Sequence, residues 1–491
     1  MTRLRHRSAL AGLILMAGLL SAPGGQAQPP QKKEENKPAD TWLLDRALTV
    51  SPAPAPIPAL KYRLYPRTMD RKDGNAVPIY LRFAHERSDA TKKLLREKPD
   101  EWNKLTLEKL PLTEVQPFLD NYKYYFHQLD LGARRKTADW NYTLDAGNPI
   151  GILLPDAQEI RMYAPLLVLK ARVEMAAGRF PDAIRTLETG FSLSQQISEG
   201  PFLITGLIAI ACATKFADCL LEVIERPNAP NLYWALAVLP RPLVDQRKSN
   251  EFEQQILELQ FPYLADLDRI HSPEEWDITL RRFRRDVEQI FQVFQGSPNV
   301  KPVKPGSAVT DPAAKSSDLP AAKKYLAEVV GMAAGRIDTM SPAEVLIRYQ
   351  MSYHHEIRDE LFKGYYIPFP QSQPLFVEAE RRLKSGPDTE AARLAEGLLP
   401  ILRAVRLAQI RIERKLASLR AIEALRMHAA ANGGELPDRL DEVKVAPVPN
   451  DPGTGQPFEY HRDGPTATLT SRIPGEPLNQ TGLRYRITLR K

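Results

Sequence analysis

Residues 165–213 restrict the possible folds of this 491-residue chain more than any other segment. Apolar residues recur there every three or four positions on both sides of Gly178, which predicts two amphipathic helices joined by a tight turn. Residues 202–213 are apolar almost throughout, but about 12 residues are too few to span a bilayer. We therefore expect a helix in the middle of a hydrophobic core and a mainly α protein.

The two cysteines, Cys212 and Cys219, lie seven residues apart in the same predicted helix. Two helical turns separate their Cα atoms by about 10 Å, beyond the limit of roughly 7 Å for a disulfide. We expect two buried thiols that pack as small apolar groups. Packing alone must then hold the fold together.

The N-terminus has the pattern of an export signal. A basic stretch precedes 12 mostly apolar residues, 9–20, and then small residues that end at Ala27. This order is typical of a secretory signal peptide over residues 1–27, cleaved near Ala27. An uncleaved anchor is less favoured, because 12 apolar residues cover little more than half of a bilayer. We expect an exported protein, periplasmic or at the cell surface, whose mature chain has no transmembrane span.

Net charge argues against nucleic acid as a partner. Removal of residues 1–27 takes away three arginines and no acids, so the formal charge falls from +7 to +4. A charge of that size gives no electrostatic basis for binding a polyanion. We expect other envelope proteins as partners.

Composition divides the first part of the chain. Residues 28–58 are rich in proline and charge and are predicted to form a disordered spacer, in which a short apolar segment at residues 42–44 docks on the folded body. Residues 59–295 are predicted to form a helical domain that contains the hairpin at 165–198. Residues 296–318 carry four prolines among Gly, Ser, Lys and Ala, which predicts a flexible linker.

The second part begins with a helical segment at residues 319–390 and continues with a different unit at residues 391–491. Between residues 391 and 431 apolar residues recur every three or four positions, so we predict one long helix bent near Pro400. Between residues 401 and 426 seven Lys or Arg face two Glu, which predicts either a solvated face or a docking surface for an anionic polymer. Short alternating runs then predict a small antiparallel sheet, so the C-terminal unit is α+β.

Established catalytic and metal-binding sequence motifs are absent from the chain, so the catalytic residues are unknown and no cofactor or metal is expected. The segment from Gly190 to Ser194 is the nearest approach to a nucleophile elbow. It lacks the second glycine and lies inside a predicted helix, whereas the elbow requires a strand-to-helix turn. We therefore expect these serines to be ordinary helix residues.

One candidate site combines carboxylates with aromatic rings. Asp139, Asp145 and Asp156 bracket an apolar segment that contains Trp140 and Tyr142. Carboxylates beside aromatic rings can form a glycosidase site, which two acids at a suitable separation would define. Loop contacts and helix caps are the alternative interpretation.

The densest ionisable cluster spans residues 353–360. On a helix His355 and Asp359 share a face at the i, i+4 spacing of metal ligands, whereas His354 shares its face with Arg358, whose charge opposes a cation. A zinc site needs three or four ligands and this face supplies two. We therefore expect a surface helix with ordinary ion pairs.

Two regions resemble known protein groups. The turn from Gly178 to Phe180, with Ala183 three residues further on, resembles a tetratricopeptide hairpin, although no 34-residue period recurs. Motifs between residues 59 and 250 resemble a group of exported proteins of planctomycete bacteria, which implies export and a helical architecture but no activity. These motifs lie at residues 59–64, 74–76, 153–158, 178–190 and 229–242.

Residues 391–491 are similar to type II secretion pseudopilins. The long helix is followed by Gly434–Leu440 and then by a run from Asn450 to Tyr460, as in the spine helix, loop and first strands of that fold. The resemblance implies a helix packed on a small sheet. The pseudopilin helix is N-terminal and begins with an apolar segment, whereas this helix is internal and basic, so a structural module is the preferred interpretation over a pilus subunit.

These observations predict a non-enzymatic interaction or scaffold protein of the cell envelope. Two alternatives stay open. One is a hydrolase acting on an envelope polymer, with the acids at residues 139–156 as its candidates. The other is an accessory component of a secretion or pseudopilus system, acting through residues 391–491.

Overall fold

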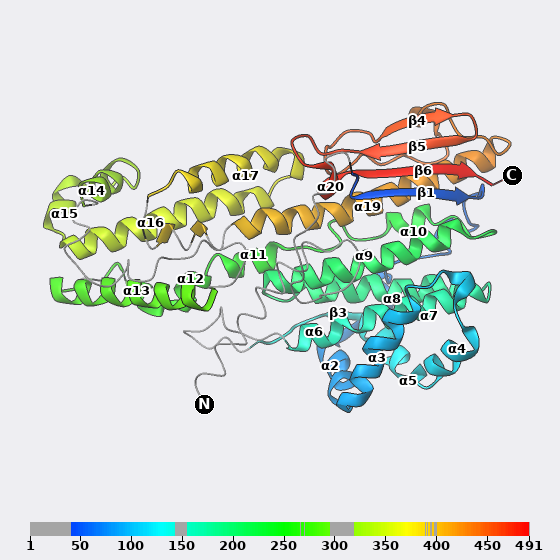
Figure 1. Ribbon diagram of the computed structural model, residues 1–491, viewed down its shortest axis with the longest axis horizontal. Coiled ribbons are helices and arrows are strands. Elements are labelled where there is room, and N and C mark those ends of the chain that lie inside the picture. Colours follow the sequence, from blue (N-terminus) through cyan, green and yellow to red (C-terminus); the bar gives the residue numbers. More distant parts are fainter. Residues whose placement is uncertain are drawn as a thin grey trace. The chain divides into compact units, whose positions relative to one another are not determined.

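The computed structural model describes residues 41–142, 155–294 and 319–490, apart from residues 266, 270, 388, 390, 393–394 and 397–399. The predicted signal peptide at 1–27 and the predicted linker at 296–318 lie outside the described residues. The described chain is mainly α-helical with a small four-stranded β-sheet, as the sequence predicts, and with a separate pair of short strands (Figure 1). Among the described residues, no helix has both the length and the apolar composition needed to cross a bilayer.

The described residues form two compact units. The helical unit consists of residues 250–294 and 319–406, and the mixed unit consists of residues 41–141, 155–249 and 407–490. Helices before and after the predicted linker belong to the same unit, so the boundary between units does not fall at 296–318. Two helices, α11 (Arg247–Glu253) and α19 (Pro400–Ala431), each contribute residues to both units.

In the mixed unit, four helices lie between two short parallel strands, and further helices follow the second strand. The strands are β2 (Lys72–Asn75) and β3 (Arg135–Thr137). The helices are α2 (Val77–His85), α3 (Asp89–Trp102), α4 (Leu112–Asp120), α5 (Lys123–Ala133), α6 (Pro155–Arg161), α7 (Tyr163–Ala176), α8 (Phe180–Ser198), α9 (Leu203–Glu225) and α10 (Tyr233–Ala237).

The predicted helical hairpin is confirmed by α7 and α8. Gly178 between them has a φ of +71°, a left-handed conformation that favours glycine and allows the tight turn. The next helix, α9, packs closely on α8, because a Cβ atom at Gly190 would lie 2.5 Å from the ring of Phe216. The two cysteines are buried in α9 and unpaired, also as predicted, and burial raises the pKa of Cys212 to about 11.

The sheet has the strand order β1–β6–β5–β4 (Figure 1). Strands β4 (Glu459–Asp463), β5 (Thr466–Ser471) and β6 (Leu483–Leu489) are antiparallel, with the short helix α20 (Leu478–Thr481) before β6. Strand β1 (Leu44–Val50) is parallel to β6, with Leu44 opposite Leu483 and Val50 opposite Leu489. The three C-terminal strands thus form the antiparallel sheet that the sequence predicts, and the addition of β1 makes the whole sheet mixed.

Strand β1 also corrects the predicted spacer at residues 28–58, because residues 44–50 belong to the fold. Leu48 and Val50 are 1% and 0% exposed, whereas Ala47 and Thr49 are exposed. This alternation is typical of a half-buried strand, and the prolines that follow it obscured the pattern. The predicted docking of residues 42–44 agrees with the position of Trp42, whose ring lies 5.0 Å from the guanidinium of Arg472 and 4.9 Å from that of Arg484.

The basic helix α19 is a core helix within the mixed unit. It begins at Pro400, where the sequence predicted a bend, and from Leu407 to Ala429 every residue is buried or half-buried. Arg414 and Arg426 are fully buried. Both interpretations of its basic faces, as a solvated face or as a docking surface for an anionic polymer, were therefore wrong for this part of the helix.

The helical unit is built around α16. Its helices are α12 (Ile256–Gln260), α13 (Pro273–Phe294), α14 (Leu319–Glu328), α15 (Ala334–Thr339), α16 (Pro342–Phe362) and α17 (Phe369–Lys384). One core cluster joins α13 to α16 through Phe283, Ile347 and Met351, and a second joins α14 to α16 through Leu326 and Val345. The unit thus contains helices from both sides of the predicted linker.

Candidate functional site

The structure describes Asp139, Trp140 and Asp156 among the candidate glycosidase residues. Trp140 is buried, and its indole N–H donates to the carbonyl of Gln196 at 3.1 Å. The Asp139 carboxylate accepts the backbone N–H of Asn141 at 3.1 Å, and Asp156 lies in the first turn of α6. Asp145 lies outside the described residues. The structure therefore uses this indole in packing, where it offers no face to a sugar ring.

The serines near Gly190 are helix residues, as expected. Ser192 is buried in α8 and its hydroxyl donates to the carbonyl of Ala133 on α5 at 2.6 Å. The hydroxyl of Ser194 donates to the carbonyl of Gly190 at 3.1 Å, one turn earlier in the same helix. The Ser192 hydroxyl thus ties α8 to α5, whereas the Ser194 hydroxyl bonds within α8.

His355 and Asp359 both take part in ion pairs. Nε2 of His355 lies 2.7 Å from a carboxylate oxygen of Glu258 on α12, and Arg358 lies 3.3 Å from the same oxygen. Asp359 accepts from Nε of Arg358 at 2.9 Å. Burial raises the pKa of Glu258, but the hydrogen bond from His355 and the nearby cations hold it below its ordinary value. The expected ion pairs are present, and they connect α16 to α12.

His354, the residue before His355, is a core residue. It is 4% exposed, and burial lowers its pKa to about 4, so the imidazole is neutral at pH 7. Within the described ranges, no group of three or more His, Cys, Asp or Glu side chains has the arrangement to hold a metal ion.

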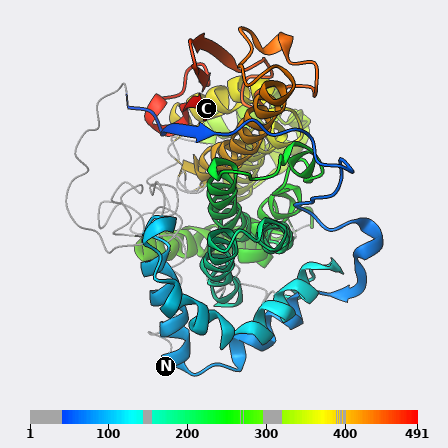
Figure 2. The ribbon, with the colours of Figure 1, turned by 90° about the vertical axis from the view of Figure 1, so that its right-hand side faces the viewer.

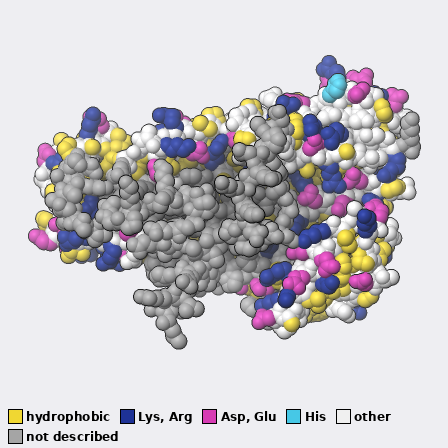
Figure 3. All heavy atoms as spheres, in the orientation of Figure 1, with side chains coloured by type: hydrophobic (Ala, Val, Ile, Leu, Met, Phe, Trp, Pro, Cys, Tyr) yellow, Lys and Arg dark blue, Asp and Glu magenta, His cyan; other side chains and the backbone are white. Residues whose placement is uncertain are grey.

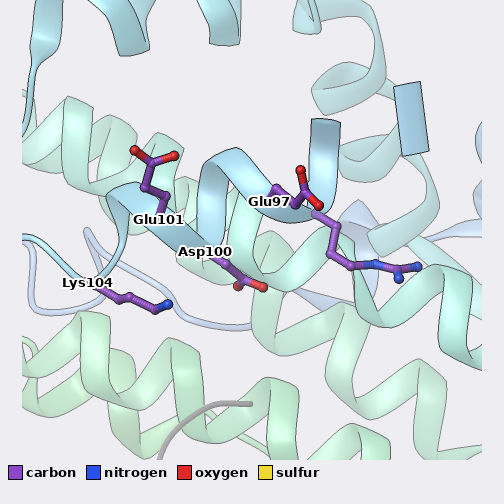
Figure 4. Close-up of a pocket in the computed structure, with 5 residues that line it drawn as sticks. Glu97, Asp100, Glu101 and Lys104 are labelled. Carbon is purple, nitrogen blue, oxygen red and sulfur yellow. The ribbon is translucent and has the colours of Figure 1, made fainter. Parts of the chain in front are cut away.

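A surface hollow of about 310 Å³ lies along α3 and is lined entirely by charged residues of that helix and of the turn after it. The lining residues are Arg96, Glu97, Asp100, Glu101 and Lys104. The four that Figure 4 labels point in different directions and do not converge on one point. Glu101 is already paired with Lys98 at 3.1 Å. The hollow therefore lacks the convergent polar groups of a ligand site.

Two buried ionic clusters on α19 had no signal in the sequence. In the first, Nε of Arg414 donates to Asp451 and to the hydroxyl of Ser471, both at 3.1 Å, and Nη1 donates to the carbonyl of Thr481. A Cβ atom on Gly453 would lie 2.7 Å from the Arg414 side chain, so a glycine at this position leaves room for the arginine. The cluster ties α19 to the loop before β4 and to β5.

In the second cluster, Arg426 forms two hydrogen bonds with the carboxylate of Glu423, at 2.9 and 3.0 Å, and both side chains are fully buried. Arg426 also donates to the carbonyls of Ser51 and Ala229, each at 2.9 Å. Because its partners are backbone carbonyls of the same chain, this arginine joins three segments of the mixed unit. Both clusters are structural.

Exposed apolar side chains concentrate on α3, α4, α5 and their connections. Large apolar residues at least one third exposed lie close together along the sequence there, and Figure 3 shows hydrophobic side chains gathered over α4 and its neighbours. These residues are Leu94, Leu105, Leu112, Tyr124 and Leu131. Contiguous apolar surface of this kind marks interaction sites in soluble proteins.

Comparison of the chain with protein-family models, with curated proteins and with solved structures gives no match. A proposal for the function of this protein therefore rests on its own sequence and structure.

Proposed function

We propose that this protein is an exported, non-enzymatic interaction or scaffold protein of the cell envelope, and that it binds a protein partner through α3–α5. The observation that carries the proposal is the apolar surface on these helices. Tyr124 is 54% exposed and Leu112 is 40% exposed, although both lie on helices that pack within the mixed unit. Burial of such side chains is what stabilises most protein interfaces.

The chemistry of the candidate sites supports the same proposal. The polar groups that the sequence offered for catalysis, Ser192 and His355 among them, contact neighbouring elements of their own unit. A pilus function through the long helix would need a free helix face, and between Leu407 and Ala429 every residue is at least half-buried. A scaffold function needs only a stable fold and an exposed surface.

The test is crosslinking in the producing cell followed by mass spectrometry, with the tagged full chain. Leu112→Asp and Tyr124→Asp together should lower the yield of crosslinked partners at least tenfold, because they place charges in the interface. Ile278→Asp is the matched control, since Ile278 is 59% exposed on α13 in the helical unit. If the double variant captured the same partners as the unaltered chain, the proposed surface would be wrong. Capture of no protein by any version would count against the scaffold function itself.

A further inference from the structure

The segment from residue 51 to residue 71 forms a strap that connects β1 to β2 on the surface of the mixed unit. Figure 2 draws it in blue, running from β1 along one side of the unit. Contacts hold the strap at several points. Ala53 donates its N–H to the carbonyl of Arg426 at 3.0 Å, Leu64 is fully buried, and the hydroxyl of Tyr65 donates to Gln195 at 3.2 Å.

Two large apolar side chains project from this anchored strap. Ile57 is 92% exposed, and Met69, in a short 3-10 helix at Thr68–Asp70, is 91% exposed. Leu60 between them is 53% exposed. Ile57 and Met69 have the highest exposures among the large apolar residues of the described chain. Because the backbone on both sides is fixed by buried contacts, the exposure is built into the fold.

The strap is also basic. Residues 57–73 contain five Lys or Arg and two Asp, a net charge of +3. Arg67 pairs with Asp70 at 2.7 Å, while Lys61 and Lys72 are exposed. The adjacent strand β3 adds Lys136, which pairs with Asp73 at 2.8 Å. The segment that carries the projecting apolar side chains thus has an excess of positive charge.

We infer that this strap docks on an anionic lipid surface, with Ile57 and Met69 inserted among the acyl chains and the basic side chains facing the headgroups. A bilayer accepts single projecting side chains at any position, whereas a protein partner must supply a preformed pocket for each of them. Charge complementarity selects an anionic headgroup, since each Lys or Arg near the surface adds to the attraction. An anionic polysaccharide would satisfy the charges but would leave the apolar side chains in water.

The test is flotation of the full chain with lipid vesicles, on protein purified after export and with its N-terminus determined by mass spectrometry. Vesicles of phosphatidylcholine with phosphatidylglycerol are compared with vesicles of phosphatidylcholine alone, at low and high salt. The unaltered protein should bind the anionic vesicles, and binding should weaken with salt. Ile57→Ala with Met69→Ala should lower the partition coefficient at least about tenfold, because the variant removes most of the inserted apolar surface.

A further variant tests the contribution of the basic side chains, and another serves as a control. Lys61→Gln with Lys72→Gln should lower binding to anionic vesicles and make the binding less dependent on salt. Ile278→Asp, on α13, should bind within twofold of the unaltered chain, and circular dichroism checks the fold of each variant. No binding to anionic vesicles, or equal binding by the Ile57 and Met69 variant, would overturn the inference. Loss of a crosslinked protein with that variant, without vesicle binding, would identify the strap as a protein contact instead. The partner surface on α3–α5 is tested separately, so the two proposals can fail independently.

Discussion

Asp451→Asn would leave the guanidinium of Arg414 buried beside a neutral amide. The two side chains are 0% and 2% exposed and 3.1 Å apart. At this distance the attraction is about 5 kcal/mol for an effective dielectric constant of about 20. Ser471 and the carbonyl of Thr481 still accept hydrogen bonds from Arg414 in the variant and offset part of the loss. We expect the free energy of unfolding to fall by about 3–4 kcal/mol.

The assay is urea unfolding followed by circular dichroism, together with hydrogen exchange of β4, β5 and β6. Asp441→Asn is the matched control, because Asp441 pairs with Arg439 at 2.8 Å while the two side chains are 65% and 74% exposed. The control should cost about 1 kcal/mol or less. Arg414→Met combined with Asp451→Asn should recover most of the loss, since it removes both buried charges. A loss for Asp451→Asn as small as that of the control would refute the reasoning.

Three further predictions concern other buried groups. Val50→Ala should lower the free energy of unfolding by about 1–3 kcal/mol in the same urea assay, because Val50 is 0% exposed in β1, and an unchanged midpoint would contradict its core position. Burial lowers the pKa of His354 from 6.5 to about 4. Between these two pH values the unfolded chain binds a proton at this residue that the folded chain does not. The contribution of His354 to the free energy of unfolding should therefore fall by roughly 3 kcal/mol from pH 6.5 to pH 4. His354→Gln should flatten this slope relative to the exposed His461→Gln control, measured by urea unfolding at each pH. Cys212 and Cys219, 1% and 2% exposed, should react with a thiol reagent only after unfolding, and rapid labelling of the native protein would show that α9 is accessible.

The sequence predicted the elements whose signals are local. The hairpin of α7 and α8 follows from apolar residues at helical spacing on both sides of Gly178, and the buried thiols follow from their spacing in one helix. Ser272 and Glu275, three residues apart, form a capping box at the start of α13, in which Glu275 accepts the N–H of Ser272 at 2.7 Å and Ser272 accepts that of Glu275 at 3.2 Å. In each case the residues that decide the structure lie within two or three turns of each other.

The features that the sequence did not predict depend on distant partners. Strand β1 pairs with a strand at the other end of the chain, so its alternation alone, next to prolines, gave too weak a signal. The arginines of α19 looked like a charged surface because their partners are the carboxylate of Asp451 and backbone carbonyls such as that of Ser51. A carbonyl leaves no trace in the amino-acid sequence, and no local pattern shows which charge will be paired after folding.

The parallel pairing of β1 with β6 imposes an order on the making of this protein. Asp45 and Arg484 form an ion pair across 439 residues, so the strand synthesised first acquires its neighbour only after β6 has been made. Until then Leu48 and Val50 have no sheet to join. A chain that stops before residue 483 loses the strand that lies between β1 and β5, and both remaining edges are left unpaired. The sheet is thus completed only after more than 400 residues have been added behind its first strand.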